Sequence, residues 1–445
     1  MRTSGRNKRQ EILLTGTGPG ATAGRRRHCR VLVLSLLLFG LAGLAQLAGG
    51  CGGPKSAKNP DAGTKTISGA RSSDSEHLAQ QGIRGQSVPQ WENMLKRKSG
   101  WLGADGVYAL ALNGVEKPGM AAEGETFFWF SDSIIGEIEG DSLQSDWEMV
   151  HNSVAYLQGD RPDTSRIRFY WNEGTSGEAL SAFEPHTPAS REGDYYWLGD
   201  GVFNHALDST IYLFAYRIRN VPGQVFPFKG VGLSLIALPK GSRPPFSEQR
   251  QMDVPFFLDD SKGRGNVVFG ASVLPNTRGA GAPAPDGYLY IYGIRGPGKE
   301  LLVARVKDTA FENFSQWRFW NGGAWVPDIH EAAALTSRVS NEMSVSFMED
   351  GRVIAVYQLD TNSPDIVVQV GDRPEGPFYP YKKVFETPQI YEDIDFYTYN
   401  AKAYPHLSQP GQLLISYNVN AFNFVEKLHQ HPHHLRPRFI TVQYE

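Results

Sequence analysis

The chain has 445 residues, with 44 lysines and arginines against 47 aspartates and glutamates, and a formal net charge of −3 at pH 7. Such a balance gives no basic footprint for nucleic acid, so we expect no nucleic-acid partner. Aromatic residues make up 12% of the chain, and 48 glycines and 28 prolines favour an all-β fold with many turns. Cys29 and Cys51, the two cysteines, both precede the region expected to fold, which therefore has no internal disulfide and no thiolate metal site.

The N-terminal segment has the features of an export signal. Four arginines between Arg25 and Arg30 precede the apolar run 31–39, and the small residues 48–50 lead into Cys51. This order resembles a bacterial lipoprotein signal, in which the cysteine is lipidated and becomes the first mature residue. A transmembrane anchor is the alternative, since the apolar stretch approaches the ~18 residues that a span needs. The run ends in glycines without a charged flank, which favours the lipoprotein; a twin-arginine signal fits less well.

Three regions follow from this reading. Residues 1–50 are predicted to be the lipoprotein signal peptide, and residues 51–97 the lipidated cysteine and a flexible linker. Up to residue 85 the linker is rich in small and polar residues, which is typical of a tether, and 90–95 form a short helix where order begins. Residues 98–445 are the β domain. We expect an exported monomer in the cell envelope, attached to the membrane through a lipid on Cys51.

From Trp101 onward short apolar runs alternate with turn signals, and no long helical period is present. These runs group into five sets of about four, which is the strand count of a five-bladed β-propeller. The last set is one strand short, and the C-terminal strand is expected to pair with the N-terminal side and close the ring. A β-sandwich with a second β domain is the alternative, but no linker divides the region. The runs are 107–112, 126–130, 150–157 and 167–171; 202–207, 211–218, 231–238 and 252–258; 267–274, 287–292, 301–306 and 317–320; 343–347, 353–359, 366–370 and 383–385; and 399–404, 412–417 and 439–444.

Carboxylates stand at the start of several of these sets. In a propeller the innermost strand of each blade lines the channel, so residues at its start can reach a ligand. Three of five such positions are acids, and cleavage of a glycosidic bond needs one carboxyl group as acid and another to activate water or attack the sugar. Asp105 and Asp200 each precede a glycine and could be simple turn residues. Glu342 precedes an apolar strand, where a buried charge is costly unless it is used. The five positions are Asp105, Asp200, Asn266, Glu342 and Asn400.

Other polar and aromatic residues surround these positions in the sequence. We predict Asp105, Asp200 and Glu342 as catalytic and six further residues as substrate-binding, although blade packing is the alternative for each aromatic residue, Trp101 and 195–197 included. The histidine-rich stretch 429–434 is expected to be a solvated loop rather than a metal site, since no acid lies within it. No cofactor is predicted, and a structural calcium ion in the channel is left open. The six substrate-binding residues are Asp132, His151, Asn152, Trp197, Asn400 and Lys402.

Nine short segments resemble those of secreted bacterial propeller proteins long described only as a domain of unknown function, some of which are endo-acting D-arabinofuranases. They are DGVY (105–108), FSDSIIG (130–136), MVHNS (149–153), LVARV (302–306), SNEMS (340–344), EGPF (375–378), YNAK (399–402), ISYNVN (415–420) and RPRF (436–439). More distantly, the chain resembles five-bladed glycoside hydrolases that act on arabinans, xylans and fructans. The resemblance covers most of 101–445, and it implies a five-bladed propeller with carboxylate-based glycoside hydrolase activity.

The resemblance also suggests roles. The distant relatives carry their acids in the order Asp, Asp, Glu, which Asp105, Asp200 and Glu342 reproduce, although Glu342 falls in the fourth set rather than on the third blade. We expect Glu342 as general acid and Asp105 as base or nucleophile, with Asp200 orienting the sugar or tuning the pKa of Glu342. The substrate would be a furanose-containing polysaccharide of the arabinan type. The alternatives are a non-catalytic glycan-binding surface lipoprotein and a structural scaffold, and neither requires two converging carboxyl groups.

Overall fold

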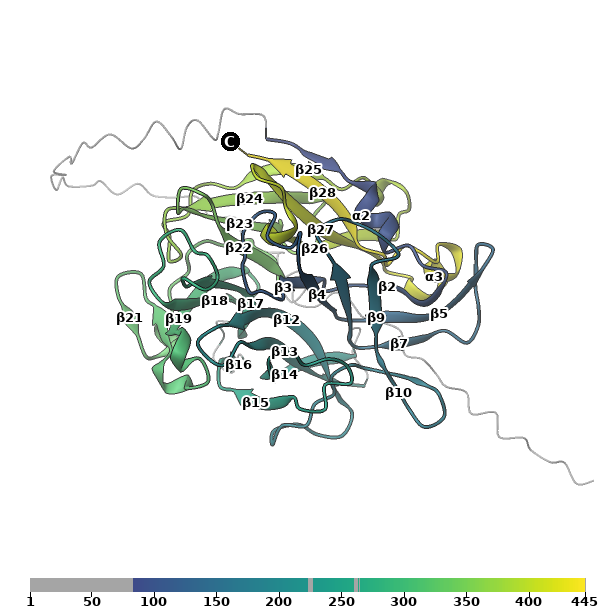
Figure 1. Cartoon of the computed structure of the whole chain (residues 1–445), viewed down its shortest axis with the longest axis horizontal. Coiled ribbons are helices and arrows are strands. Elements are labelled where there is room, and N and C mark those ends of the chain that lie inside the picture. Colours follow the sequence, from purple (N-terminus) through teal and green to yellow (C-terminus); the bar gives the residue numbers. More distant parts are fainter. Residues whose placement is uncertain (1–82, 223–226, 260–262, 264, 445) are drawn as a thin grey trace, which may run out of the picture. The chain divides into compact units, whose positions relative to one another are not determined.

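Strands form most of the computed structural model, which describes residues 83–222, 227–259, 263 and 265–444 (Figure 1). The expected signal peptide and Cys51 lie outside the described residues. The all-β prediction is confirmed, because the helices are short: α2 (Pro89–Met94), α3 (Phe424–Gln430) and single 3₁₀ turns. Within the described part of the chain, no helix is both long and apolar enough to cross a membrane. The 3₁₀ turns are η1 (Asp308–Ala310), η2 (Phe314–Gln316), η3 (Ile329–Glu331), η4 (Pro388–Tyr391) and η5 (Pro405–Leu407).

Five of the sheets in the described residues consist of strands that pair antiparallel with their neighbours in the sheet. The first sheet is β3 (Tyr108–Ala111), β4 (Glu125–Phe130), β8 (Ser153–Gln158) and β9 (Ile167–Tyr170); the second is β12 (Asp194–Asn204), β13 (Thr210–Asn220), β14 (Phe228–Leu238) and β15 (Arg250–Val254). The third is β16 (Phe257–Leu258), β17 (Val267–Asn276), β18 (Tyr288–Arg295), β19 (Glu300–Lys307), β20 (Arg318–Trp320) and β21 (Trp325–Val326). The fourth is β22 (Met343–Phe347), β23 (Val353–Gln358), β24 (Asp365–Gly371) and β25 (Lys382–Glu386), and the fifth is β26 (Phe396–Ala403), β27 (Gln412–Ala421), β28 (Arg438–Gln443) and β1 (Gly85–Ser87).

One strand from each of these sheets faces the centre, and we call these strands, β3, β12, β17, β22 and β26, the inner strands (Figure 1). β12 contacts β3 and β17, and β22 contacts β17 and β26. The series closes because β26 and the residue after it bond to the start of the first sheet: the Tyr399 hydroxyl donates to the Asp105 carboxylate and the Tyr404 hydroxyl to the Val107 carbonyl oxygen. Residues at corresponding positions of five strands are thereby gathered around one interior.

The hydrophobic core lies between neighbouring sheets. One buried cluster joins Trp129 of the first sheet to Leu213 of the second, and similar clusters join each later pair. A fifth cluster joins the fifth sheet to the first through Phe439 and Phe128. The alternating apolar faces that these strands carry are therefore buried on both sides of each sheet, at about 1.5–3 kcal/mol for each large side chain removed from water.

The strand missing from the last predicted set lies at the N-terminal end of the described residues. β1 pairs antiparallel with β28, placing Gly85 opposite Val442, and α2 follows with Trp91 and Met94 buried. Within the segment predicted as linker, ordered structure thus begins with β1, and α2 lies where a short helix was expected at 90–95. Without β1, β28 would present an unpaired edge, whereas the three-residue strand itself has too little apolar character to be recognised in the sequence.

A further sheet and a hairpin were not predicted. The sheet contains β2 (Ser99–Ala104), β5 (Ser133–Glu139), β6 (Ser142–Leu143) and β7 (Glu148–Val150), and the hairpin contains β10 (Asn172–Glu173) and β11 (Ala179–Leu180). β2 pairs antiparallel with β5, and Ala104 at the end of β2 lies opposite Ser133 at the start of β5. This pairing fixes the residues that immediately follow β2 and precede β5.

Candidate active site

The pairing of β2 with β5 places two aspartates side by side. Asp105 follows the last residue of β2, and Asp132 precedes the first residue of β5. Their backbones are bonded directly, because the Asp105 N–H donates to the Asp132 carbonyl oxygen over 3.1 Å. The Ser131 N–H donates in turn to the Asp105 carbonyl oxygen over 2.9 Å. Both side chains are 2% exposed, so the fold holds two carboxyl groups together in a nearly dry environment.

Asp132 is held by one of its two carboxylate oxygens. Oδ1 accepts hydrogen bonds from Nδ1 of His151 over 2.9 Å and from Nε1 of Trp197 over 3.0 Å. The His151 ring is stacked on Tyr195 with 3.7 Å between the ring centroids, and its side chain is 31% exposed. Oδ2 of Asp132 has no hydrogen-bond partner among the described residues. Asp132 is thus oriented by two donors to Oδ1, and its buried Oδ2 keeps its capacity to accept a hydrogen bond.

Asp105 is in a different environment. Burial raises the pKa of Asp105 well above its ordinary value, and the negative charges of Asp132 and Glu342 raise it further. The Tyr399 hydroxyl donates to Oδ2 of Asp105 over 2.8 Å, which opposes that rise without cancelling it. The Asp105 carboxyl group can therefore hold a proton at a pH at which an exposed aspartate would have lost it.

Glu342 is bound by two residues of β26. Oε1 accepts from Nδ2 of Asn400 over 3.0 Å, and Oε2 forms an ion pair with the buried Nζ of Lys402. The register of β26 shifts between Tyr399 and Lys402, and Asn400 adopts a φ of +62°. Such a β-bulge redirects side chains, and bulges are frequent beside functional sites. Lys402 also lies over the ring of Tyr108, 3.7 Å from its centroid, and burial lowers the pKa of Lys402.

Asp200 stands at a second bulge, where the register of β12 shifts between Leu198 and Gly201. Its Oδ1 accepts from the Gly201 N–H over 2.8 Å, and its Oδ2 accepts from the Val273 N–H over 2.7 Å. Burial raises the pKa of Asp200 to about 7, and the charge of Glu116 contributes in the same direction. Asp200 therefore ties β12 to β17 while it titrates near neutral pH.

These acids form one electrostatic group, which we call the carboxylate cluster: Asp105, Asp132, Asp200 and Glu342. The charges of Asp132 and Glu342 act on Asp105, and the charge of Lys402 acts on Asp105 in the opposite sense. Lys402 is in turn influenced by Glu342, Asp200 and Asp105. The structure thus brings the three residues predicted as catalytic into one group and adds Asp132 to it.

Two residues predicted to bind substrate, Asn152 and Trp197, are hydrogen-bonded to other groups of the protein. Asn152 donates to the carbonyl oxygens of Phe183 and Tyr196 and accepts from the Phe183 N–H, so its amide is occupied by backbone groups. Trp197 packs edge-on against Phe228 and orients Asp132, so it offers no free ring face for a sugar. Both assignments are corrected: Asn152 is structural, and Trp197 is a positioning residue.

Burial also changes the interpretation of Trp101 and of the histidine-rich stretch 429–434. Trp101 is stacked on Phe169 in the core, at 4.3 Å between ring centroids. The stretch 429–434 is not a solvated loop throughout, because His429 belongs to α3 and His434 is buried against Phe396. Across the described ranges, no group of three or more His, Cys, Asp and Glu residues is placed to hold a metal ion.

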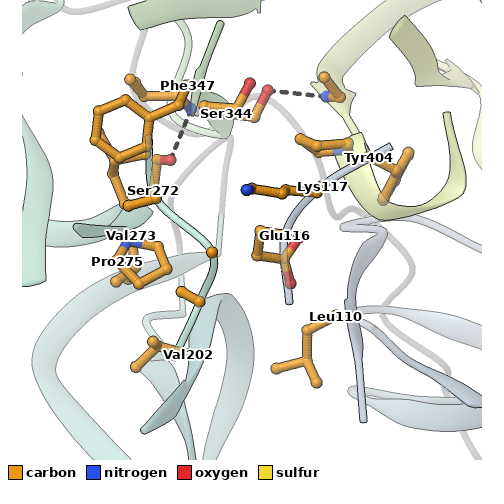
Figure 2. Close-up of a pocket in the computed structure, with 18 of the residues that line it drawn as sticks. Leu110, Glu116, Lys117, Val202, Ser272, Val273, Pro275, Ser344, Phe347 and Tyr404 are labelled. Atoms are coloured by element: carbon orange, nitrogen blue, oxygen red, sulfur yellow. Dashed lines mark hydrogen bonds between the residues drawn. The ribbon is translucent and has the colours of Figure 1, made fainter. Parts of the chain in front are cut away.

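A cavity of about 400 Å³ lies among the inner strands (Figure 2). Its walls contain later residues of β12, β17 and β26, such as Val202, Pro275 and Ala403. The carboxylate cluster adjoins this cavity, because Asp200 of β12 lines it and Glu342 directly precedes Met343, the first residue of β22, which lines it as well. Asp200 and Lys402 line the cavity, whereas Asp105, Asp132 and Glu342 do not.

Sequence reasoning missed Tyr399, Tyr108 and Asn420 as members of the site. Tyr399 precedes Asn400 in a segment that had been singled out, so an alternating reading of β26 could have found it. Asn420 donates to the Tyr399 hydroxyl over 3.2 Å. Tyr108 lies beneath Lys402 because of the ring closure between the fifth and first sheets, for which the local sequence carries no signal.

Comparison with known proteins agrees with this architecture. The structure is similar to that of a candidate hydrolase from Bacteroides ovatus, with a TM-score of 0.60 and 17% identity, over 86% of this chain and 97% of that chain. It is also similar to an exo-β-1,3-galactanase from Phanerochaete chrysosporium (TM-score 0.40, 8% identity, 77% and 62% of the two chains). A GH43 β-xylosidase/α-arabinofuranosidase from a compost metagenome gives a TM-score of 0.38 at 13% identity, over 81% and 94%.

TM-scores below 0.5 are too low to establish a shared fold, so the fold likeness rests on the Bacteroides ovatus protein. No curated protein matches the sequence. Residues 89–444 match one family over most of the chain, from α2 to the end of the fifth sheet. The chain therefore belongs to the family described as Domain of unknown function (DUF5005).

Proposed function

We propose that this protein is a glycoside hydrolase that cleaves a furanose-containing polysaccharide of the arabinan type. The observation that carries the proposal is the pair Asp105 and Asp132, two buried carboxyl groups bonded through their backbones but placed in unlike environments. Glycosidases use two carboxyl groups whose surroundings separate their roles. The structure that shares the fold at a TM-score of 0.60 is itself described as a candidate hydrolase.

The unlike environments suggest which carboxyl group does what. Asp105, whose pKa is raised by burial and by its acidic neighbours, would protonate the oxygen of the leaving sugar. Asp132, oriented by His151 and Trp197 and with Oδ2 free, would attack the sugar or activate water. Asp105 thereby becomes the acid, which reverses the role expected from the sequence.

Glu342 is less suited to the acid role that the sequence suggested. It is engaged in an ion pair with Lys402 and a hydrogen bond with Asn400, so protonating Glu342 would break the ion pair. We assign Glu342 and Lys402 to binding and orienting the sugar. Asp200, bonded to two backbone N–H groups, would tune the charge balance of the cluster through Lys402.

A row of aromatic rings supports a polymeric substrate. Tyr399, which donates to Asp105, lies 5.5 Å from Tyr397 between ring centroids, and Tyr397 lies 4.9 Å from Phe422. Phe422 is 51% exposed, so the row leads from the carboxylate pair to the surface. Aromatic faces pack well against the C–H faces of sugars. We assign Phe422 as a platform for a sugar unit away from the bond that is cut.

The remaining parts of the proposal concern architecture and location. The five sheets are taken as the five blades of a propeller, since their inner strands form a closed series of contacts. The arginines, apolar run and Cys51 near the N-terminus support export and lipid anchoring in the cell envelope. A non-catalytic glycan receptor is the alternative, and the same experiment separates the two.

The test is to incubate the purified protein with D-arabinan, L-arabinan, xylan and fructan and to measure released oligosaccharides. We expect products from an arabinan that disappear in Asp105→Asn and in Asp132→Asn. Asp141→Asn, at an exposed turn, is the matched control and should retain activity. Binding to a polysaccharide with no product from any of the four would contradict the hydrolase and favour the receptor.

A further inference from the structure

The cavity among the inner strands is not lined by Asp105 or Asp132, the two residues proposed to cleave the substrate. At about 400 Å³ it has the size of a site for a small molecule, typically ~300–1,000 Å³. All five inner strands contribute to its wall, including Leu110 of β3, Val202 of β12 and Phe347 of β22. Because rigid paired strands form it, the cavity is built into the fold and does not depend on a single loop.

Two buried hydroxyl groups in its wall have no partner. The Tyr108 side chain belongs to a residue that is 3% exposed and the Ser346 side chain to one that is 7% exposed. Neither hydroxyl has a hydrogen-bond partner within the described part of the chain. Buried polar groups are nearly always hydrogen-bonded, so each of these hydroxyl groups keeps the capacity to form a further hydrogen bond. Both residues line the cavity, so a ligand there could satisfy them.

Two further hydroxyl groups can donate into the same space. The Ser272 oxygen accepts from the Val345 N–H over 2.9 Å, and the Ser344 oxygen accepts from the Ala403 N–H over 2.8 Å (Figure 2). Each hydroxyl therefore keeps its own hydrogen to donate. The cavity thus offers several neutral hydroxyl groups in addition to its apolar walls.

The charged groups in the wall oppose one another. Figure 2 shows Lys117 extending across the cavity toward Ser272, and its ammonium forms no ion pair or hydrogen bond with the residues that the structure describes. Oε2 of Glu116 beside it lies 2.8 Å from Nδ1 of His406 and accepts a hydrogen bond when that nitrogen carries the proton. Asp200 and Glu349 add two acids, and Lys402 adds one base. The wall therefore carries both carboxyl and ammonium groups, and an ion of either sign would meet a like charge.

We propose that this cavity binds a small neutral saccharide, a mono- or disaccharide, at a site separate from the carboxylate pair. Its hydroxyl groups would meet those of Tyr108 and Ser346, its C–H faces would lie on the apolar wall, and Lys117 would donate to a sugar oxygen. Asp200 of the carboxylate cluster lines the cavity, and Lys402, which also lines it, pairs with Glu342, so a bound sugar would adjoin the cluster at these two residues. The inference does not depend on the proposed cleavage.

The experiment is a calorimetric titration of the full chain with L-arabinose, D-arabinose, D-xylose, D-galactose and xylobiose, supported by saturation-transfer NMR. We expect saturable binding of at least one sugar. Lys117→Met should weaken that binding about fivefold or more, as expected for loss of one hydrogen bond from a charged donor. Lys229→Met, which changes an exposed lysine of β14, is the matched control and should not alter it.

Two further variants decide where the sugar binds. Val202→Trp fills the cavity and should abolish sugar binding, and a thermal unfolding measurement on this variant shows whether the fold survives. If Val202→Trp does not fold, Lys117→Met, at an exposed position, still decides the test. Asp132→Asn should leave binding unchanged. No saturable binding by any of the five sugars would overturn the proposal. So would binding lost in Asp132→Asn but retained in Lys117→Met, which would place the sugar at the carboxylate pair.

Discussion

The same five inner strands build two different regions, the carboxylate cluster and the cavity. In the cluster, Oδ1 of Asp132 accepts two hydrogen bonds and Glu342 is paired with Lys402, while Oδ2 of Asp132 has no partner among the described residues. In the cavity, the buried Ser346 hydroxyl lacks a partner within the same residues, and apolar residues form much of the wall. A group with partners is preoriented for chemistry, whereas one without partners can still form a hydrogen bond with an occupant.

The largest effect should come from replacing Asp105 and Asp132, the carboxylate pair of the cluster, one at a time. Asp132→Asn should lower kcat/KM by more than about 10³-fold on both an arabinan and an aryl arabinofuranoside with a good leaving group. Asp105→Asn should lose as much on the polymer but much less on the aryl substrate, because that leaving group needs no proton. Steady-state kinetics on both substrates checks this. Equal losses in Asp105→Asn on the two substrates would remove Asp105 as the acid.

A smaller effect should follow from removing one hydrogen bond that orients the Asp132 carboxylate while keeping Asp132 itself. Trp197→Phe keeps an aromatic ring but deletes the N–H that donates to Oδ1. Hydrogen bonds to charged groups contribute about 1.5–3 kcal/mol, so we expect a loss of roughly 10- to 100-fold in kcat with little change in KM. Trp320→Phe, in the third sheet, is the control. Unchanged kcat in Trp197→Phe would mean that His151 alone orients Asp132.

The aromatic row should matter only for long substrates. Phe422→Ala removes an exposed ring at the end of the row, and we expect a loss of a few-fold, about 2–10-fold, in kcat/KM on the polymer. Turnover of the aryl arabinofuranoside should not change, because that substrate does not reach Phe422. The ratio of the two kinetic constants is the measurement. A loss on both substrates would mean that Phe422 supports the fold of the site instead.

The mildest test concerns Asp200, which borders both regions. Its pKa is about 7 in the folded protein and about 3.9 in an unfolded chain. Below about pH 4 both states hold the proton, and as the pH rises the unfolded state releases it first, so the free energy of unfolding falls until about pH 7. The asparagine side chain of Asp200→Asn does not titrate, so its free energy of unfolding has no such contribution. Urea unfolding from pH 4 to 8 should show wild type losing stability relative to Asp200→Asn up to about pH 7; a constant difference would contradict the buried environment.

Sequence reasoning located most strands and named all four acids of the cluster, three as catalytic and Asp132 as substrate-binding. The runs that became β13, β18 and β23 are rich in aliphatic and aromatic residues, so their type and approximate limits could be predicted. Asp105, Asp200 and Glu342 were found because each stands at the start of such a run or within the inner strand.

Long-range pairing is what local sequence could not provide. Asp132 was noticed, but its position beside Asp105 depends on the pairing of β2 with β5, strands that lie on either side of a full hairpin. The bulges that redirect Asp200 and Asn400 carry no local marker. Asn152 and Trp197 were assigned to substrate because polarity and aromaticity do not reveal which groups the backbone and neighbouring side chains already occupy.

The strand β1 has a consequence for how the protein is made. It is the first described strand to leave the ribosome, yet its partner β28 is the last of the described strands, so the fifth sheet cannot be completed until β28 has been translated. Until then β1 has no partner in that sheet, and the nascent chain exposes the apolar face that the fifth sheet will cover. A chain that lacks β28 leaves β1 and β27 each with an edge that β28 would otherwise pair.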